Sequence, residues 1–324
     1  MKRKVAAPLH RQPKADDLSF RRAEKAFRTK DPLTKSAVLD VDEANPSVQA
    51  THCTAHAAAK RVEVSENAPP WLKNARVYKI PGVDGFRLLR CPFSREHQLR
   101  LVKQALQHWI EPPAATNLVL HGPGPYDRLW QRHQQEDSHS FLSKLTWATV
   151  GYHYQWTERK YDLQKQSPFP RDLAQVARDL AVSCGYEIEP EAAIVNLYTS
   201  RSTMGGHRDD AEVFQGAPIV SISFGLDCVY LLGKETKVDS PIAILLRSGD
   251  VVVQGGESRG FVHGVPRVIP DSLPTRSFLD AIAASASALE GGKELQDLES
   301  ICHWLDGHRI NVNVRQCFSS INVT

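Results

Sequence analysis

The sequence predicts a mainly β fold with flanking helices (α+β), with the β core in the second half of the chain. The first observation is a set of short apolar runs after residue 190, separated by Gly, Asp, Ser and Pro: AIVNLY, PIVSISFG, CVYLL, IAILL, DVVVQ and FVHGV. The second is the final run, RINVNVRQCF, in which polar and apolar residues alternate as they do along a strand. Several short strands at this spacing favour a sandwich or a barrel over a parallel sheet that alternates with helices.

Positive charge is concentrated at the N-terminus. Residues 1–35 contain eleven Lys and Arg and four Asp and Glu, a net charge of +7, whereas the whole chain carries +3. Such a segment suits a phosphate backbone or another acidic surface; a solvated tail without a partner is the alternative. Residues 34–70 have little periodicity and end in Pro69-Pro70, which is typical of a linker.

The part of the chain between this arm and the β core is expected to be helical. A short strand pair around the turn PGVDG at 81–85 is followed by a helix that Ser94 can cap and that ends before Pro112. A second helix is predicted over 171–183. The predicted division is a basic arm and linker over 1–70, a helical and lid-forming extension over 71–190, and a catalytic β core over 191–324 with a helical insertion at 270–307.

Composition limits the class of protein. With 324 residues, of which 41% are hydrophobic and 24% charged, the chain is typical of a soluble globular protein. No apolar stretch approaches the roughly 20 residues of a membrane helix, so no membrane role is expected. Six scattered Cys, without a CxxC pair or a secretory leader, favour a reducing, intracellular compartment. The nucleus, the cytoplasm and the mitochondrion are all open.

His207-Arg208-Asp209 is the sharpest local feature. Because positions i and i+2 of an extended segment project to the same face, His207 and Asp209 can point at one atom. His263, in the strand-like run FVHGV, is the natural third ligand. Two His and one carboxylate occupy one face of an octahedral ion and leave three positions open, as in non-haem Fe(II) enzymes that activate O2. A structural, hydrogen-bonded His is the alternative, since the chain contains 13 His.

The run from Arg309 to Arg315 suggests an anion site. Arg309, Asn311 and Arg315 fall on one face of the predicted strand. Two buried guanidinium groups are costly unless an anion meets them, and the planar fork of Arg suits a carboxylate such as that of 2-oxoglutarate. Asn196 and Tyr198 alternate in the same way and offer an amide and a phenol to the same anion. The alternative is a solvated outer face of an edge strand.

Taken in order, these motifs resemble the AlkB family of Fe(II)- and 2-oxoglutarate-dependent nucleic-acid dioxygenases. The resemblance rests on Asn196-Leu-Tyr198, His207-Arg-Asp209, the run APIVSISFGLDCVYLLG, His263 and Arg309-Ile-Asn-Val-Asn-Val-Arg315. It covers roughly residues 70–320. The segments LTWATVGYHYQWTERKY and PFPRDL, with the helical insertion, are most similar to the AlkB homologue 1 branch.

The resemblance implies a double-stranded β-helix (jelly-roll) core and a set of residue roles. His207, Asp209 and His263 would bind Fe(II). Arg309 would hold the distal carboxylate of 2-oxoglutarate with the help of Asn196, Tyr198 and Asn311, and Arg315 would line the pocket nearer the iron. The implied reaction consumes O2 and 2-oxoglutarate, oxidises a methyl group on a base, and releases formaldehyde, succinate and CO2.

The resemblance also implies a lid over an unpaired or flipped base of DNA or RNA, including tRNA. Trp147, Tyr152, Tyr154 and Trp156 form an aromatic cluster in this region, and stacking on them would hold one nucleotide. Ordinary core aromatics are the alternative. The acidic run Asp210-Ala-Glu212 departs from the bacterial pattern, so the methylated base is open. A monomer is expected.

Three other functions are weighed against this one. A 2-oxoglutarate oxygenase acting on a protein, such as a histone, or on a small molecule would use the same metal and cosubstrate residues. A catalytically silent binding module would lack a ligand or an Arg, and none is missing. A lyase acting at abasic sites would need an activated Lys. Since the candidate site lies beyond residue 140, removal of residues 1–35 is expected to weaken nucleic-acid binding and leave turnover of a short oligonucleotide intact.

Overall fold

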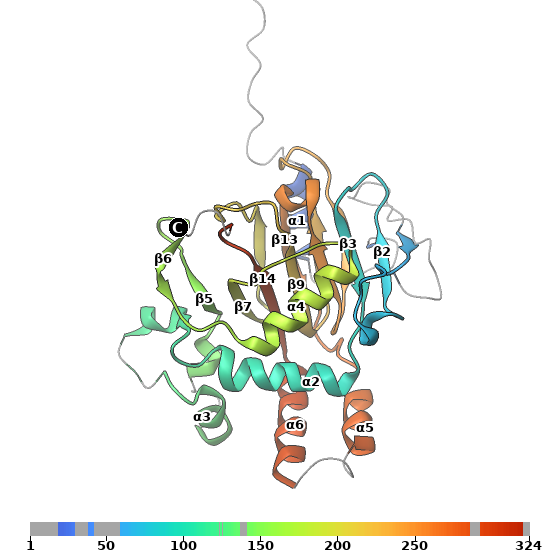
Figure 1. Ribbon diagram of the computed structural model, residues 1–324. Helices are drawn as coiled ribbons and strands as arrows, with labels where there is room; N and C mark the ends of the chain where they lie inside the picture. Colours follow the sequence, from blue (N-terminus) through green and yellow to red (C-terminus); the bar gives the residue numbers. More distant parts are fainter. Residues whose placement is uncertain are drawn as a thin grey trace, which may run out of the picture.

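The computed structural model describes residues 19–29, 38–41, 59–122, 124, 126–136, 141–285 and 292–319. Its centre is a pair of antiparallel sheets with helices outside them (Figure 1). This arrangement confirms the predicted mainly β core with flanking helices. No helix in the described ranges is long and apolar enough to cross a membrane.

The larger sheet has ten strands. Its order is β1 (Lys60–Val62), β2 (Arg76–Lys79), β3 (Phe86–Arg90), β12 (Val251–Gln254), β9 (Ile219–Gly225), β14 (His308–Arg315), β7 (Ala192–Thr199), β5 (Trp147–Gln155) and β4 (Ala115–Thr116), with β6 (Lys160–Gln166) paired to β5. The smaller sheet has four strands in the order β11 (Ile242–Leu246), β10 (Cys228–Leu232), β13 (His263–Val268) and β8 (Met204–His207). Residues of both sheets line one cavity, as expected for a jelly roll.

The segment over 71–190, expected to be helical, also supplies strands to the larger sheet. β3 pairs with β12, and β5 pairs with β7, so strands from both sides of residue 190 are joined by backbone hydrogen bonds. Cross-strand pairing depends on partners far away in the chain, which local periodicity does not reveal.

Helices cover the outer face of the larger sheet. α2 (Arg95–Gln104) continues into the π-helical turn η4 (Ala105–Trp109), and Ser94 Oγ accepts a hydrogen bond from the His97 N–H at 3.1 Å, as its predicted cap. α4 (Arg171–Ser183) has the predicted bounds. α5 (Thr275–Ser285) and α6 (Gly292–Leu305) lie next to α2 between β13 and β14 in the chain (Figure 1). The remaining helical segments are α3 (Leu129–Glu136), η3 (Pro70–Leu72), η5 (Asn117–His121), η7 (Phe141–Lys144) and η8 (Gly256–Gly260).

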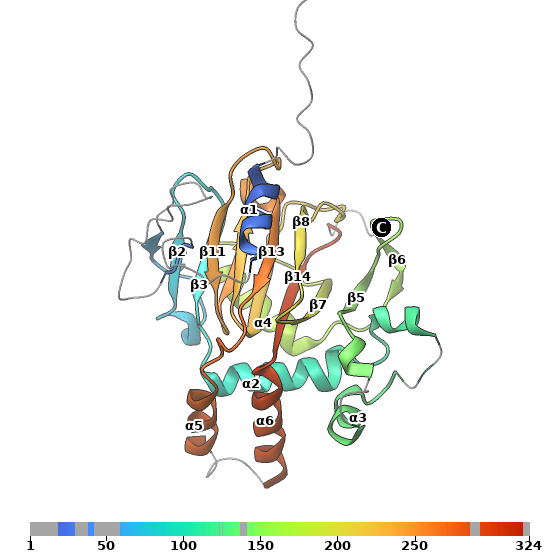
Figure 2. The same ribbon diagram turned by 180° about the vertical axis from the view of Figure 1, so that it is seen from behind.

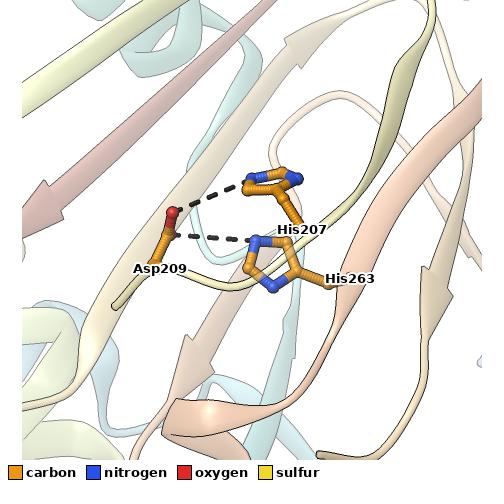
Figure 3. A group of neighbouring side chains, drawn as sticks. All are labelled: His207, Asp209 and His263. Atoms are coloured by element: carbon orange, nitrogen blue, oxygen red, sulfur yellow. Dashed lines mark ion pairs between the residues drawn. The ribbon is translucent and has the colours of Figure 1, made fainter. Parts of the chain in front are cut away.

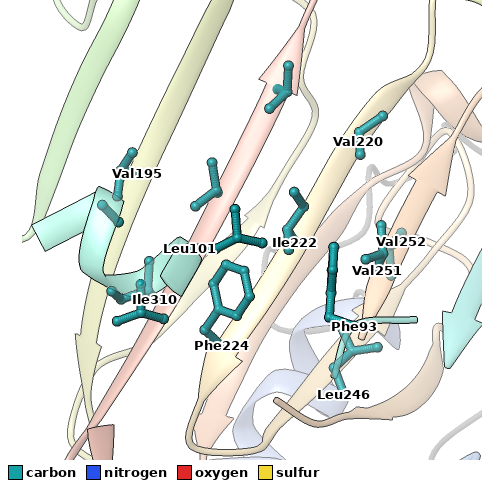
Figure 4. Packing of buried hydrophobic residues seen from close by; sticks show 14 of the residues in the cluster. Phe93, Leu101, Val195, Val220, Ile222, Phe224, Leu246, Val251, Val252 and Ile310 are labelled. Atoms are coloured by element: carbon teal, nitrogen blue, oxygen red, sulfur yellow. The ribbon is translucent and has the colours of Figure 1, made fainter. Parts of the chain in front are cut away.

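The alternation along β14 separates the core from the cavity. Ile310, Val312 and Val314 are buried in the main hydrophobic core, and Figure 4 shows Ile310 close to Leu101 of α2 and Phe224 of β9. The polar positions of the same strand, from Arg309 to Arg315, line the cavity instead. The polar face of this strand is therefore the inner one, and the solvated-edge alternative is wrong.

The N-terminal segment contributes a helix to the body of the protein. α1 (Ser19–Phe27) lies on the outer face of the smaller sheet (Figure 2), where Phe20, Ala23 and Phe27 are buried against Val229 and Leu231 of β10. The other residues of β10 point into the main core. A short bridge between Leu39 and Ile244 adds to the same sheet. Most of the predicted arm and linker over 1–70 lies outside the described residues.

Candidate active site

Two strands and one turn bring His207, Asp209 and His263 together. β8 ends at His207, β13 begins at His263, and the two residues are direct partners in this antiparallel pair. Asp209 follows β8 by two residues, and its carboxylate faces both rings (Figure 3). The Nε2 atoms of His207 and His263 lie 3.7 and 3.8 Å from its two oxygens. The candidate ligand atoms all lie within 4.8 Å of one another, so the group could hold a metal ion.

The orientation of both imidazoles suits metal binding. His207 Nδ1 lies 2.9 Å from the Gly205 carbonyl, and His263 Nδ1 lies 3.1 Å from the Phe261 carbonyl. Because a carbonyl only accepts, each Nδ1 carries a proton and each Nε2 points away from these carbonyls, toward Asp209. Such outer hydrogen bonds are the usual way to orient a metal-binding His. The triad therefore fits a divalent metal in tautomer as well as in spacing.

The protonation states suit a cation as well. Burial, together with the neighbouring His207, lowers the pKa of His263 to about 4, so this ring is neutral at neutral pH. The pKa of Asp209 lies well below its ordinary value. Burial by itself would raise this pKa, but the positive charge of Arg315 and the two neighbouring imidazoles have the larger, opposite effect. The site thus offers one carboxylate and at least one neutral imidazole.

Arg309 is buried at the far end of the same cavity, which has a volume of about 840 Å³. Only 1% of the residue is exposed; its Nη2 donates to Ser223 Oγ at 2.7 Å and its Nη1 to the Leu226 carbonyl at 3.2 Å. Its Nε is buried and has no hydrogen-bond partner among the residues that the structure describes. A fixed guanidinium with a spare donor fits an incoming carboxylate, because unpaired buried donors are rare in native proteins.

The other residues predicted to bind the cosubstrate also line this cavity. Register places Tyr198 opposite Arg309 and Asn196 opposite Asn311 across β7 and β14. Asn311 Nδ2 donates to Ser221 Oγ at 2.9 Å. Arg315 also lies in the lining, but its Nη atoms contact Asp209 Oδ2 at 3.3 Å and Glu212 Oε1 at 2.9 Å. The structure thus places Arg315 against the candidate metal ligand.

The four aromatic residues of the predicted lid divide into two groups. Tyr154 and Trp156 line the cavity, and Trp147 lies beside Trp156, with ring centroids 5.0 Å apart and the rings tilted by 44°. Tyr152 instead packs on Phe318, with ring centroids 4.9 Å apart, and is not among the residues that line the cavity. Gly151 breaks the alternation, because it has φ +71° and a Cβ there would lie 2.0 Å from the Glu191 carbonyl.

Sequence reasoning missed two residues behind the triad, Glu212 and Arg259. Glu212 belongs to the acidic run that was considered for recognition of the methylated base. Its side chain is instead 0% exposed and forms ion pairs with Arg259 and Arg315. Arg259 lies in η8, remote in sequence from its partners. In the sequence, Arg259 is marked only by its position four residues before His263, and this position does not predict a role in the site.

The fold and the site define a non-haem oxygenase, and the comparison with known families agrees. The profile of the 2OG-Fe(II) oxygenase superfamily matches residues 85–315, and the chain belongs to this superfamily. The family and enzyme class predicted from the sequence are therefore confirmed.

Individual relatives narrow the resemblance to one branch. The chain is 31% identical to the nucleic acid dioxygenase ALKBH1 of Mus musculus, over 97% of this chain and 87% of the relative. It is 33% identical to the tRNA demethylase abh1 of Schizosaccharomyces pombe, over 74% and 82% of the two chains. The structure of OsALKBH1 superposes with a TM-score of 0.50 at 21% identity, covering 72% of this chain and 96% of the other, which supports the fold.

Proposed function

We propose that the protein is an Fe(II)- and 2-oxoglutarate-dependent demethylase of methylated bases in nucleic acid, with tRNA or DNA as substrate. The observation that carries this proposal is a single cavity that joins the His207, Asp209 and His263 triad, the buried Arg309 and the aromatic side chains at the mouth. The names of the relatives, which include a nucleic acid dioxygenase and a tRNA demethylase, support the choice of substrate.

The protein's residues have separate tasks in this proposal. Bound iron, with O2 and 2-oxoglutarate, supplies the oxidising chemistry. The triad would hold the metal, and Arg309 would hold the distal carboxylate of 2-oxoglutarate. Tyr154 and Trp156 stack on the extruded base and exclude water from the cavity. Methyl oxidation on nitrogen then leads to loss of formaldehyde.

The proposal is tested by a substrate panel. Purified protein with Fe(II), 2-oxoglutarate and O2 is given methylated tRNA, single-stranded DNA, duplex DNA and a methylated histone peptide, and the products are identified by mass spectrometry. Loss of a methyl group from a nucleoside, matched by succinate and formaldehyde, supports the proposal. Turnover of the peptide alone would favour the alternative, an oxygenase that acts on a protein. No contact among the described residues specifically supports this alternative.

Replacing Arg309 with Lys should raise KM for 2-oxoglutarate by roughly 10- to 100-fold. Lys keeps the charge but loses the fork and the Nε donor, and charge-assisted hydrogen bonds are worth ~1.5–3 kcal/mol. The affinity for an oligonucleotide should change little, because Arg309 lies at the buried end of the cavity. Steady-state kinetics with each substrate varied in turn checks both values. An equal effect on the two substrates would exclude Arg309 as the cosubstrate anchor.

Replacing Trp156 with Ala should lower kcat/KM for a methylated oligonucleotide by about 5- to 150-fold, since base stacking is worth ~1–3 kcal/mol. Trp156 is 45% exposed at the mouth of the cavity. The salt dependence of binding should stay as in the wild type, because no phosphate contact is lost. Tyr152→Ala is the matched control. Because Tyr152 packs on Phe318, this variant should lose thermal stability and keep a turnover close to that of the wild type.

We further propose that the protein acts as a monomer in a reducing compartment inside the cell. Cys91, Cys184, Cys228, Cys302 and Cys317 are free thiols, and four of them are buried. Buried thiols that are not paired suit an environment in which disulfides do not form.

A further inference from the structure

Asp209 of the triad is linked to three buried charged residues, Glu212, Arg259 and Arg315, in a closed ring of contacts. Arg315 joins Asp209 Oδ2 to Glu212 Oε1, with distances of 3.3 and 2.9 Å. Arg259 closes the ring from the other side: its Nη2 donates to Glu212 Oε2 at 2.9 Å and its Nη1 to the Asp209 carbonyl at 2.5 Å. Asp209 is therefore held at its side chain by one guanidinium and at its backbone by another.

The ring is balanced in charge and shielded from solvent. It contains two carboxylates and two guanidinium groups, and the side chains of Arg259 and Glu212 are 4% and 0% exposed. Neither Glu212 nor Arg259 is among the residues that line the cavity. A buried charge is tolerated when an opposite charge lies beside it, so each member depends on the others, although the Nε atoms of Arg259 and Arg315 have no hydrogen-bond partner among the described residues. These two residues can act on the site only through Asp209 and Arg315.

Arg259 extends from a turn that is itself well anchored. In η8, the Ser258 N–H donates to the Asp84 carbonyl at 3.0 Å, and Ser258 Oγ donates to the Gly255 carbonyl at 2.9 Å. Gln254 Nε2 donates to the Ser258 carbonyl at 2.9 Å. The chain then runs directly from η8 into β13, where His263 is the first residue. The segment that carries His263 therefore also holds the turn that carries Asp209.

We propose that Arg259 is a positioning residue that sets the distance between the two ligand-bearing segments, acting through Glu212 and the Asp209 carbonyl. This inference rests on the proposed metal site. Arg is required because one planar group must donate to two acceptors on the same turn at once, which the single ammonium of Lys does not reproduce. Glu212 has the complementary task of joining Arg259 to Arg315.

The proposal is tested by binding of Mn(II), a stand-in for Fe(II) that needs no O2 or cosubstrate, with free Mn(II) measured by electron paramagnetic resonance. Arg259→Lys and Glu212→Gln should raise the dissociation constant for Mn(II) by about 10- to 100-fold, the usual effect of losing a residue that orients a metal ligand. Arg90→Lys is the matched control, since Arg90 forms a buried pair with Asp250, at 2.7 Å, outside the ring. This control should lose stability and keep the Mn(II) affinity.

The outcomes separate this inference from the proposed function. If the wild-type protein does not bind Mn(II), the metal site itself is wrong. If the wild type binds Mn(II) and Arg259→Lys binds it equally well, or if Arg90→Lys weakens binding to the same extent, the positioning role is overturned. If Arg259→Lys does not fold, Glu212→Gln decides, because it preserves the shape of the side chain and removes the charge and one of the two acceptor oxygens that join the two arginines.

Discussion

Replacing Asp209 with Ala should reduce turnover of any methylated substrate to the background rate. Asp209 supplies the carboxylate of the triad, and its two oxygens face His207 and His263 at 3.7 and 3.8 Å. Without it, two imidazoles would hold the metal weakly and without the facial geometry. Mn(II) affinity should fall by more than about 100-fold, because even residues that only orient a ligand are worth 10- to 100-fold. Release of formaldehyde and Mn(II) titration are the measurements.

Asp210→Asn is the matched control for this variant. The neighbouring carboxylate also lies at the cavity, but it pairs with Arg159 at 3.0 Å at the exposed mouth and is not part of the triad. It should therefore keep the wild-type Mn(II) affinity. Full turnover by a purified, metal-loaded Asp209→Ala protein would disprove the assignment of the triad.

Replacing Phe20 with Ala should destabilise the protein by ~3–5 kcal/mol, the usual cost of removing a buried aromatic ring. Phe20 is 0% exposed. A Cβ on Gly206 would approach its ring to 2.4 Å and a Cβ on Gly233 to 3.0 Å, so the ring fills a space that two glycines provide. Denaturant unfolding measures the change. Arg21→Ala, an exposed position on the same helix, should stay within about 0.5 kcal/mol of the wild type.

The contacts of α1 also change the expectation for N-terminal truncation. Glu24 accepts a hydrogen bond from the Gly206 N–H at 2.5 Å, directly before the candidate ligand His207. The sequence alone predicted that a protein without residues 1–35 would keep its turnover. The contacts of α1 argue against this, because they connect the N-terminal segment to the strand that carries His207. Removing residues 1–18 should weaken nucleic-acid binding and reduce its salt dependence, because fewer phosphates are neutralised. Removing residues 1–29 should in addition lower the stability of the protein and its Mn(II) affinity. Equal Mn(II) affinity in the two truncations would show that α1 does not support the site.

Much of the site follows from local patterns in the sequence. The spacing of His207 and Asp209 places both on one face of an extended segment, and the alternation from Arg309 to Arg315 separates a polar face from an apolar one. Both properties depend only on the period of a strand. Which face is the inner one stayed open in the local pattern, because two buried arginines are costly unless an anion meets them, and only the family resemblance pointed to the inner face. The structure agrees, with Ile310 in the core and Arg309 at the cavity.

Other features depend on contacts that local patterns do not encode. The sequence placed Tyr152 with the lid, but its ring packs on Phe318, whereas Tyr154, two residues further on, lines the cavity. Gly151 has a positive φ and lies against the carbonyl of Glu191, a residue 40 positions away, so a side chain does not fit there. A single glycine within a strand-like run does not reveal which way the next side chains will point.

The sequence by itself predicted the fold class from strand periodicity and the superfamily from the order of its motifs, and it proposed the residues for metal and cosubstrate from the chemistry of their side chains. Only the tertiary structure decided that α1 is part of the body and that Glu24 and Arg259 form hydrogen bonds to the segment that carries His207, Asp209 and Glu212. These hydrogen bonds join residues that are 182, 47 and 50 positions apart. A buried charge is stable only beside its partner, and the folded chain alone determines which groups become neighbours.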